Sequence, residues 1–218
     1  MIKFSNLIHS LTLAGLVVGF TPALNAALII EQPLGGFSSG TSFAGQAFVP
    51  NDAVDESTSI SPTPFPDPVQ LVEFTVFRGN DGDPGQVFLN IYSSLSGGVI
   101  GGFVGSSAEV DWNASSPGSA VVFAFDNLIL DPDTKYFAAL STTATSGDIV
   151  STRMRGQGGN PYSGGGVVLN NAGGNITEAA NNDLRFEAVF VIPEPGSMSL
   201  LVSGLVLVGL RKRRSTNA

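Results

Sequence analysis

Apolar and polar residues alternate along several short stretches of the chain, the pattern of half-buried β-strands. In the segment VQLVEFTVFR at residues 69–78, the alternation predicts Val72, Phe74 and Val76 on the buried face of a strand. Similar runs predict strands at residues 43–49, 69–78, 86–92, 99–104, 120–130, 135–142, 148–155, 166–170 and 184–191.

Turn-forming residues separate these runs and leave little room for helices. The chain has 27 glycines and 13 prolines, and no long stretch repeats apolar residues every three or four positions. Strands with one dry and one wet face build antiparallel sheets that pack on each other. The pattern therefore predicts an all-β, antiparallel β-sandwich of jelly-roll topology, with loops at residues 51–68 and 156–166.

The first 26 residues have the layout of a secretory signal peptide. Lys3 precedes the apolar run at residues 11–20, and small residues follow around Ala26 and Ala27. We expect a signal helix that is cleaved so that the mature chain begins at Ala27 or Leu28. The alternative is a buried N-terminal helix, which would carry polar residues along one face.

The C-terminal 26 residues combine three features in order. The motif Pro193-Glu194-Pro195 stops any preceding strand, and residues 198–210 are an apolar segment of about 13 residues. A basic tail, which the positive-inside rule places in the cytoplasm, follows at Arg211, Lys212, Arg213 and Arg214. This order predicts a short transmembrane helix with the preceding domain outside the cell.

These three features together resemble the PEP-CTERM sorting signal of Gram-negative bacteria, over residues 193–218. The resemblance implies that a membrane protease, exosortase, processes the signal near Pro193-Glu194-Pro195. It further implies that the protein stays in the inner membrane during processing and then reaches the cell surface or extracellular matrix. An ordinary tail anchor that is never cleaved is the alternative.

The middle of the chain, residues 27–192, is expected to be one domain. It resembles the β-sandwich domains of choice-of-anchor proteins in FAGQAFVPND at 43–52, VQLVEFTVFRGNDGDPGQVFLNIYSS at 69–94, LDPDTKYFAALS at 130–141 and LRFEAVFV at 184–191. The resemblance implies a fold and a surface location, and it carries no catalytic residues.

Charge narrows the range of partners. The chain has 10 basic and 18 acidic residues, and five of the basic ones, Lys3 and the four of the tail, belong to the targeting segments. The expected mature domain is therefore strongly acidic, which argues against nucleic acid and anionic lipid as partners.

The residue types available also exclude several kinds of chemistry. The chain has no cysteine, and its only histidine, His9, lies in the signal peptide. A mature domain without these residues cannot build a Ser-His-Asp triad, a common zinc site, an iron–sulfur cluster or the usual haem site. Carboxylate chemistry and oxygen-ligated calcium remain open. We expect no cofactor and no enzyme activity.

Three candidate sites follow from the remaining residue types. Glu109 and Asp111 alternate on a strand like glycosidase acids, but Asn113 and Ala114 stand where a third acid would be needed. Asp81 and Asp83 in the turn Asn80-Asp81-Gly82-Asp83 could bind calcium, assisted by Asp131 or Asp133, although a plain hairpin turn is the simpler interpretation. Tyr162, in a glycine-rich loop, is the aromatic residue best suited to stack on a sugar from an exposed position.

These observations predict a non-enzymatic β-sandwich with a structural or adhesive role among extracellular polysaccharides. A carbohydrate-binding module of the same fold is the second interpretation. A glycoside-acting enzyme is the third.

Overall fold

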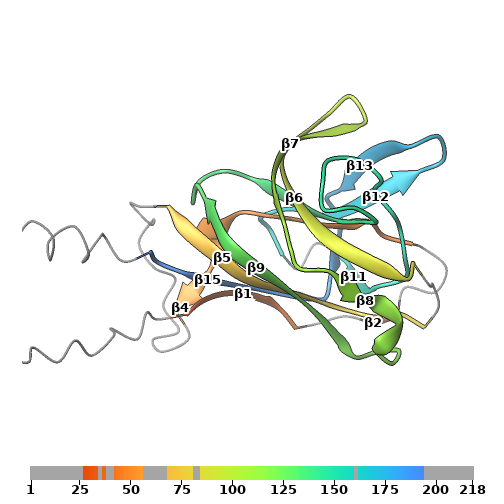
Figure 1. Cartoon of the computed structure of the whole chain (residues 1–218), viewed down its shortest axis with the longest axis horizontal. Helices are drawn as coiled ribbons and strands as arrows, with labels where there is room; N and C mark the ends of the chain where they lie inside the picture. Colours follow the sequence, from red (N-terminus) through yellow and green to blue (C-terminus); the bar gives the residue numbers. More distant parts are fainter. Residues whose placement is uncertain are drawn as a thin grey trace, which may run out of the picture.

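The computed structural model describes residues 27–33, 36–37, 42–55, 68–80, 84–159 and 162–193, and its strands form antiparallel sheets (Figure 1). The first sheet has five strands. In spatial order these are β4 (Val54–Asp55), β1 (Leu28–Gln32), β15 (Phe186–Val191), β5 (Val69–Phe77) and β9 (Ala120–Leu130).

The second sheet has seven strands, and a small third sheet has three. The second sheet runs in the order β13 (Asn175–Ala179), β12 (Val167–Asn171), β3 (Gly45–Phe48), β10 (Tyr136–Ser141), β6 (Gln86–Ser96) and β7 (Val99–Ser106), with β8 (Val110–Asp111) also pairing with β6. The third contains β14 (Asn182–Leu184), β11 (Arg155–Gly158) and β2 (Gly36–Phe37). Two short 3₁₀ helices are η1 (Pro50–Asp52) and η2 (Trp112–Ala114).

Side chains from the two large sheets share one hydrophobic core. Phe74 of β5 stacks on Phe186 of β15 with ring centroids 5.4 Å apart, and Phe48 of β3 packs against Phe74 at 5.5 Å. All three rings are fully buried. Rings from both sheets thus interlock, and the predicted all-β, antiparallel, sandwich-like fold is confirmed for the described residues.

The alternation along β5 is interrupted, so part of its predicted buried face is wrong. The register between β5 and β9 shifts between Leu71 and Glu73, and Asn127 on β9 has a left-handed φ of 52°. An irregular pair of this kind reverses the facing of the residues on its two sides. Leu71 is therefore fully buried together with Phe74, whereas Val72 is only half-buried.

The second sheet is not wet on its outer face, which corrects the expectation of one dry and one wet face. All six residues of β10 are buried. A second apolar cluster fills the outer face, formed by Ala44, Ala47, Tyr92, Phe137, Ala139, Val168 and Ile176. The sheet curls into a half-barrel, and the Ile176 backbone N–H at one edge donates to the Gly98 carbonyl at the other at 2.8 Å.

The strand register gives the sandwich two distinct ends. At one end, called the terminal pole here, Leu28 pairs with Phe190 and Val69 pairs with Leu130. At the other end, the distal pole, β1 and β5 finish and β9 and β15 begin. The described chain therefore starts and ends at the terminal pole, which lies at the left of Figure 1.

The expected signal helix at residues 1–26 and all but the first residue of the sorting segment at 193–218 lie outside the described residues. Within the described part of the chain, no helix has the length and apolar character needed to span a membrane.

Candidate functional site

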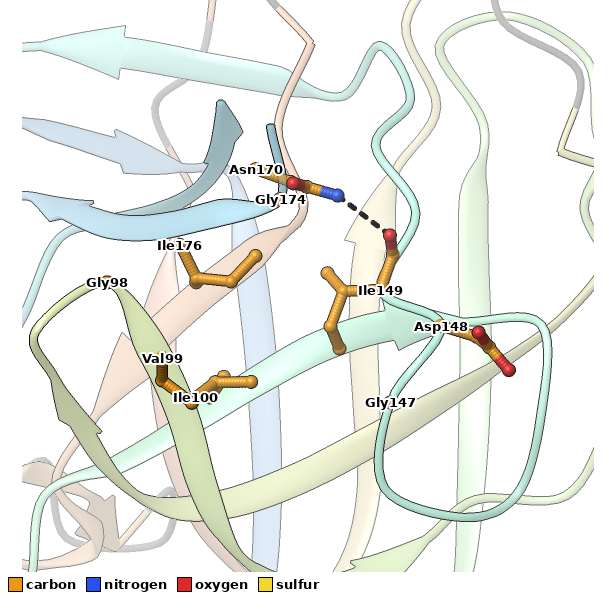
Figure 2. A pocket seen from close by; sticks show the side chains of 9 residues that line it. All are labelled: Gly98, Val99, Ile100, Gly147, Asp148, Ile149, Asn170, Gly174 and Ile176. Carbon is orange, nitrogen blue, oxygen red and sulfur yellow. Dashed lines mark hydrogen bonds between the residues drawn. The ribbon is translucent and has the colours of Figure 1, made fainter. Parts of the chain in front are cut away.

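A pocket of 280 Å³ opens where the curled sheet brings three chain segments together (Figure 2). The turn and first residues of β7 line it at 98–100, and the loop after β10 lines it at 147–149. The β12–β13 hairpin completes it with Asn170, Gly174 and Ile176. The pocket therefore depends on the curling of the sheet and on two hairpins that are distant in sequence.

The lining combines apolar and polar groups. Val99, Ile100, Ile149 and Ile176 give the pocket an apolar surface, and Asp148 lies at its edge with its carboxylate pointing away from these four side chains (Figure 2). Ligand sites in proteins are often such apolar hollows with a few polar groups, and 280 Å³ lies near the lower end of their range. The arrangement has the features of a binding site for a small moiety.

Fixed hydrogen bonds hold the pocket wall that carries Asp148. The Asn170 side-chain amide donates to the Ile149 carbonyl at 2.8 Å (Figure 2). Behind the loop, the buried Asn90 side-chain amide donates to the carbonyls of Thr143 at 3.0 Å and Thr145 at 2.8 Å. Asp148 itself has a left-handed φ of 48°, a conformation that Asp and Asn adopt more readily than most residues. The backbone at Asp148 is therefore held by the fold, and its side chain is exposed.

Tyr162 does not present an exposed ring, which corrects the expectation of an exposed stacking residue. Its side chain is buried, with 9% of its surface exposed, and packs edge-on against Phe186 at 5.3 Å between ring centroids. Its hydroxyl accepts from the Val49 N–H at 2.9 Å and donates to the Asp52 carboxylate at 2.8 Å. Burial raises the pKa of Tyr162. The ring thus ties the glycine-rich loop to the core.

Asp183 extends this buried network. Its carboxylate accepts from the Tyr162 backbone N–H at 3.0 Å and from the Gln46 side-chain amide at 3.0 Å. Gln46 in turn accepts from the Leu184 N–H at 2.8 Å. Burial raises the pKa of Asp183, and the two hydrogen bonds that it accepts act in the opposite direction. A fully buried carboxylate with these partners has a structural role and is not accessible to a substrate.

Of the two acids in the glycosidase-like pattern, Glu109 is exposed on the surface and Asp111 caps a helix. Glu109 and Asp111 are exposed, and Trp112 is fully buried. The Asp111 carboxylate accepts from the Asn113 N–H at 3.0 Å and so caps η2. No acid stands at positions 113 or 114 to pair with them.

The predicted calcium site at Asp81 and Asp83, assisted by Asp131 or Asp133, stays a prediction, although the residue before it lies far from Asp131. Asp131 follows β9 at the terminal pole, whereas Asn80 follows β5 at the distal pole. A strand of nine residues is about 30 Å long. Asp81 and Asp83 themselves lie outside the described residues. Among the residues that are described, no three His, Cys, Asp or Glu side chains are grouped for a metal ion.

The pocket residues were not identified from the sequence. Apolar residues dominate the lining, and nothing in their spacing separates them from core positions. The glycines that edge the pocket, at positions 98, 147 and 174, all have positive φ and mark the turns that form it. Such turns are visible in a sequence, but their convergence depends on tertiary structure.

Comparison with protein-family models gives no match, and comparison with curated proteins gives no significant match.

Proposed function

We propose that this protein is an exported, exosortase-processed β-sandwich that acts without catalysis as a structural or adhesive component of the cell surface or extracellular matrix. The observation that carries the proposal is the register of β1 with β15, which pairs Leu28 with Phe190. The signal peptide would end just before Leu28, and the sorting segment would begin just after Val191. A domain attached through the terminal pole would present its distal pole to the surroundings.

The chemistry of the chain supports a role without catalysis. The buried acid Asp183 and the buried hydroxyl of Tyr162 are engaged in hydrogen bonds within the core. The exposed Asp111 caps a helix. Neither arrangement offers the pair of opposed carboxyls that glycoside hydrolysis requires.

The strand order supports a jelly roll as the detailed topology of the sandwich. Strands β1, β15, β5 and β9 lie side by side in one sheet, and β3, β10, β6 and β7 lie side by side in the other. Two interleaved sets of four strands are the arrangement of a jelly roll with two Greek keys. The β12–β13 hairpin, inserted between β10 and β15 in the sequence, extends the second sheet.

The second candidate function is a carbohydrate-binding module, and the pocket at the curled sheet favours it. An apolar hollow suits the C–H face of a sugar ring, and Asp148 and Asn170 supply acceptor and donor groups for hydroxyls. No aromatic ring lines this hollow, so the apolar contact would come from isoleucine and valine side chains.

Cell fractionation tests the first proposal. We expect the full chain, expressed in a host that has exosortase, to reach the surface, and Pro193→Ala with Glu194→Ala to accumulate in the inner membrane. A matched control, Pro132→Ala in a turn of the sandwich, should not change localisation. Equal distribution of the motif variant and the control would refute the sorting proposal.

A glycan array with the exported protein tests the second candidate. Asp148→Asn keeps the size of the side chain and tolerates the left-handed backbone, so it removes only the charge. Asp126→Asn, an exposed acid on β9, is the matched control. Saturable binding that weakens with Asp148→Asn alone would support the pocket as a glycan site, and the absence of any saturable glycan would dismiss it.

A further inference from the structure

The fold gathers the arginines of this acidic domain at the distal pole. Arg78 follows β5 there and forms a bridge with Met154. The neighbours of Met154, Arg153 and Arg155, therefore lie at the same end of the molecule, with their side chains on the opposite face from that of Arg78. The Arg185 N–H, just before β15, donates to the Arg155 carbonyl at 2.8 Å. Four cations from three separate parts of the sequence thus meet at one end of the molecule.

Their side chains are held by specific contacts. The Arg185 guanidinium lies over the ring of Phe77, 3.8 Å from its centroid. The Arg155 guanidinium lies against Gly118, where any Cβ would overlap it. Arg78 donates to the backbone carbonyls around η2, including that of Trp112 at 3.2 Å. All four arginines are half-buried, so their charges are fixed at the surface instead of extending freely into solvent.

Acidic residues also gather at the terminal pole. Asp131 and Asp133 lie in the turn after β9. The helix η1, which carries Asp52, packs beside that turn, because the Asn51 N–H donates to the Pro132 carbonyl at 3.0 Å. The fifth cation of the domain, Lys135, lies apart from the arginines and pairs with Glu178 at 2.7 Å. The described sandwich therefore carries acids at its terminal pole, whereas its distal pole gathers four arginines with Asp111 and the Glu31–Glu187 pair near them.

We propose that this arginine cluster, defined as Arg78, Arg153, Arg155 and Arg185, binds a polysaccharide that carries carboxylate groups. The guanidinium group matches the geometry of a carboxylate with two parallel hydrogen bonds, and it is the preferred cation at such sites. The half-exposed Phe77 ring beneath Arg185 holds its guanidinium in place by a cation–π contact.

The arrangement of the poles selects this partner and orients it. An anionic polymer is repelled by the acidic remainder of the domain and is attracted where the arginines are gathered. The inference rests on the proposed function, because attachment through the terminal pole directs the cluster away from the membrane and toward the matrix. An anionic membrane surface would instead meet the acidic pole.

The test measures binding of the exported protein, purified after expression of the full chain, to polygalacturonate at low and at physiological salt. We expect saturable binding that weakens as salt rises, because exposed charges are screened. The double variant Arg155→Gln with Arg185→Gln should bind roughly tenfold more weakly, as expected for the loss of two surface charge pairs. Lys135→Gln removes the same kind of charge elsewhere and should leave binding unchanged.

Two further variants separate binding from folding. Arg155→Lys with Arg185→Lys keeps the charge but loses the forked geometry, and it should bind at an intermediate strength. Arg153→Gln should weaken binding without removing the contacts of Arg185 with Phe77 or of Arg155 with Gly118. The thermal midpoint of every variant is measured, so that weaker binding is attributed to the cluster only in variants that stay folded.

Four results would overturn the proposal. Lys135→Gln could weaken binding as much as the double variant does, or the protein could bind neutral dextran as tightly as polygalacturonate. Single-stranded DNA could bind as tightly as polygalacturonate or more tightly, or the cluster could mediate self-association without any binding of polysaccharide. Surface localisation of the same variants is followed in parallel. A protein that binds polygalacturonate but never reaches the surface would refute the proposed function and leave the arginine site standing. A protein at the surface that does not bind would refute only the site.

Discussion

Replacing Asp183 by alanine tests the buried network that joins β3, β14 and the loop before β12. The substitution removes the acceptor of two hydrogen bonds, from the Tyr162 N–H and from the Gln46 amide, each 3.0 Å long. Both donors would remain in the interior without that partner. An unsatisfied buried donor costs about 1–3 kcal/mol, and removing a buried carboxylate offsets part of the loss. We expect the free energy of unfolding to fall by about 2–4 kcal/mol.

Urea denaturation followed by tryptophan fluorescence measures this change. Trp112 is the only tryptophan and is fully buried, so its emission reports unfolding of the sandwich. The matched control is Asp126→Ala, which removes an exposed carboxylate from β9 and should change the free energy by less than about 0.5 kcal/mol. A loss for Asp183→Ala no greater than that of the control would refute the account of this network.

The pH dependence of the stability of Asp183→Asn, compared with that of the wild type, provides a second, independent test. Burial raises the pKa of Asp183 above its usual value of 3.8, so protonation favours the folded state. The contribution of Asp183 is therefore fully present below pH 3.8 and is lost as pH rises through the raised pKa. The advantage of the wild type over Asp183→Asn should be larger at pH 3.5 than at pH 7, and the opposite trend would contradict the assignment.

Three further predictions concern burial and close packing. Burial raises the pKa of Tyr162 above 10.0, so its stabilising effect is lost above pH 10. Above pH 10, the free energy of unfolding of the wild type should therefore fall by about 1.4 kcal/mol per pH unit more than that of Tyr162→Phe, as measured by urea titrations. Equal slopes for the two proteins would contradict this prediction. A Cβ at Gly45 would overlap the Ala138 carbonyl on β10, so Gly45→Ala should cost about 3 kcal/mol, whereas Gly101→Ala on β7 should be tolerated. Phe137→Ala in the outer cluster should lower the free energy of unfolding by about 3 kcal/mol, and Val122→Ala at an exposed position should lower it by less than about 1 kcal/mol. Equal decreases in denaturant titrations would mean that the outer cluster is not packed.

Local patterning in the sequence predicted most of the long strands and their antiparallel arrangement. It missed β1, β8 and β13, and it was wrong at residues 148–155, where the structure has isolated bridges at Ile149, Thr152 and Met154 before β11. In the strand predicted at residues 86–92, the alternating apolar residues Val87, Leu89 and Ile91 are all buried in the core. Asn90 and Tyr92, which alternate with them, are buried as well, because the curled sheet and the loop at 143–145 cover them. Covering of this kind comes from tertiary contacts and leaves no trace in the local pattern.

The functional features of the surface depended even more on long-range contacts. The burial of Tyr162 involves hydrogen bonds with Asp52 and Asp183, which are far from it in the sequence and come close to it only after folding. The arginine cluster unites residues that the sequence scatters over more than 100 positions. Composition predicted a strongly acidic domain, and the strand register adds that four of its cations lie at one end of it.

The mass of the mature protein at the cell surface is the most direct test of the central claim. Intact-mass spectrometry of the protein from a host with exosortase should show a chain that begins at Ala27 or Leu28 and lacks Arg211 to Ala218. A mature chain that retains the basic tail would contradict processing and would indicate a permanent tail anchor.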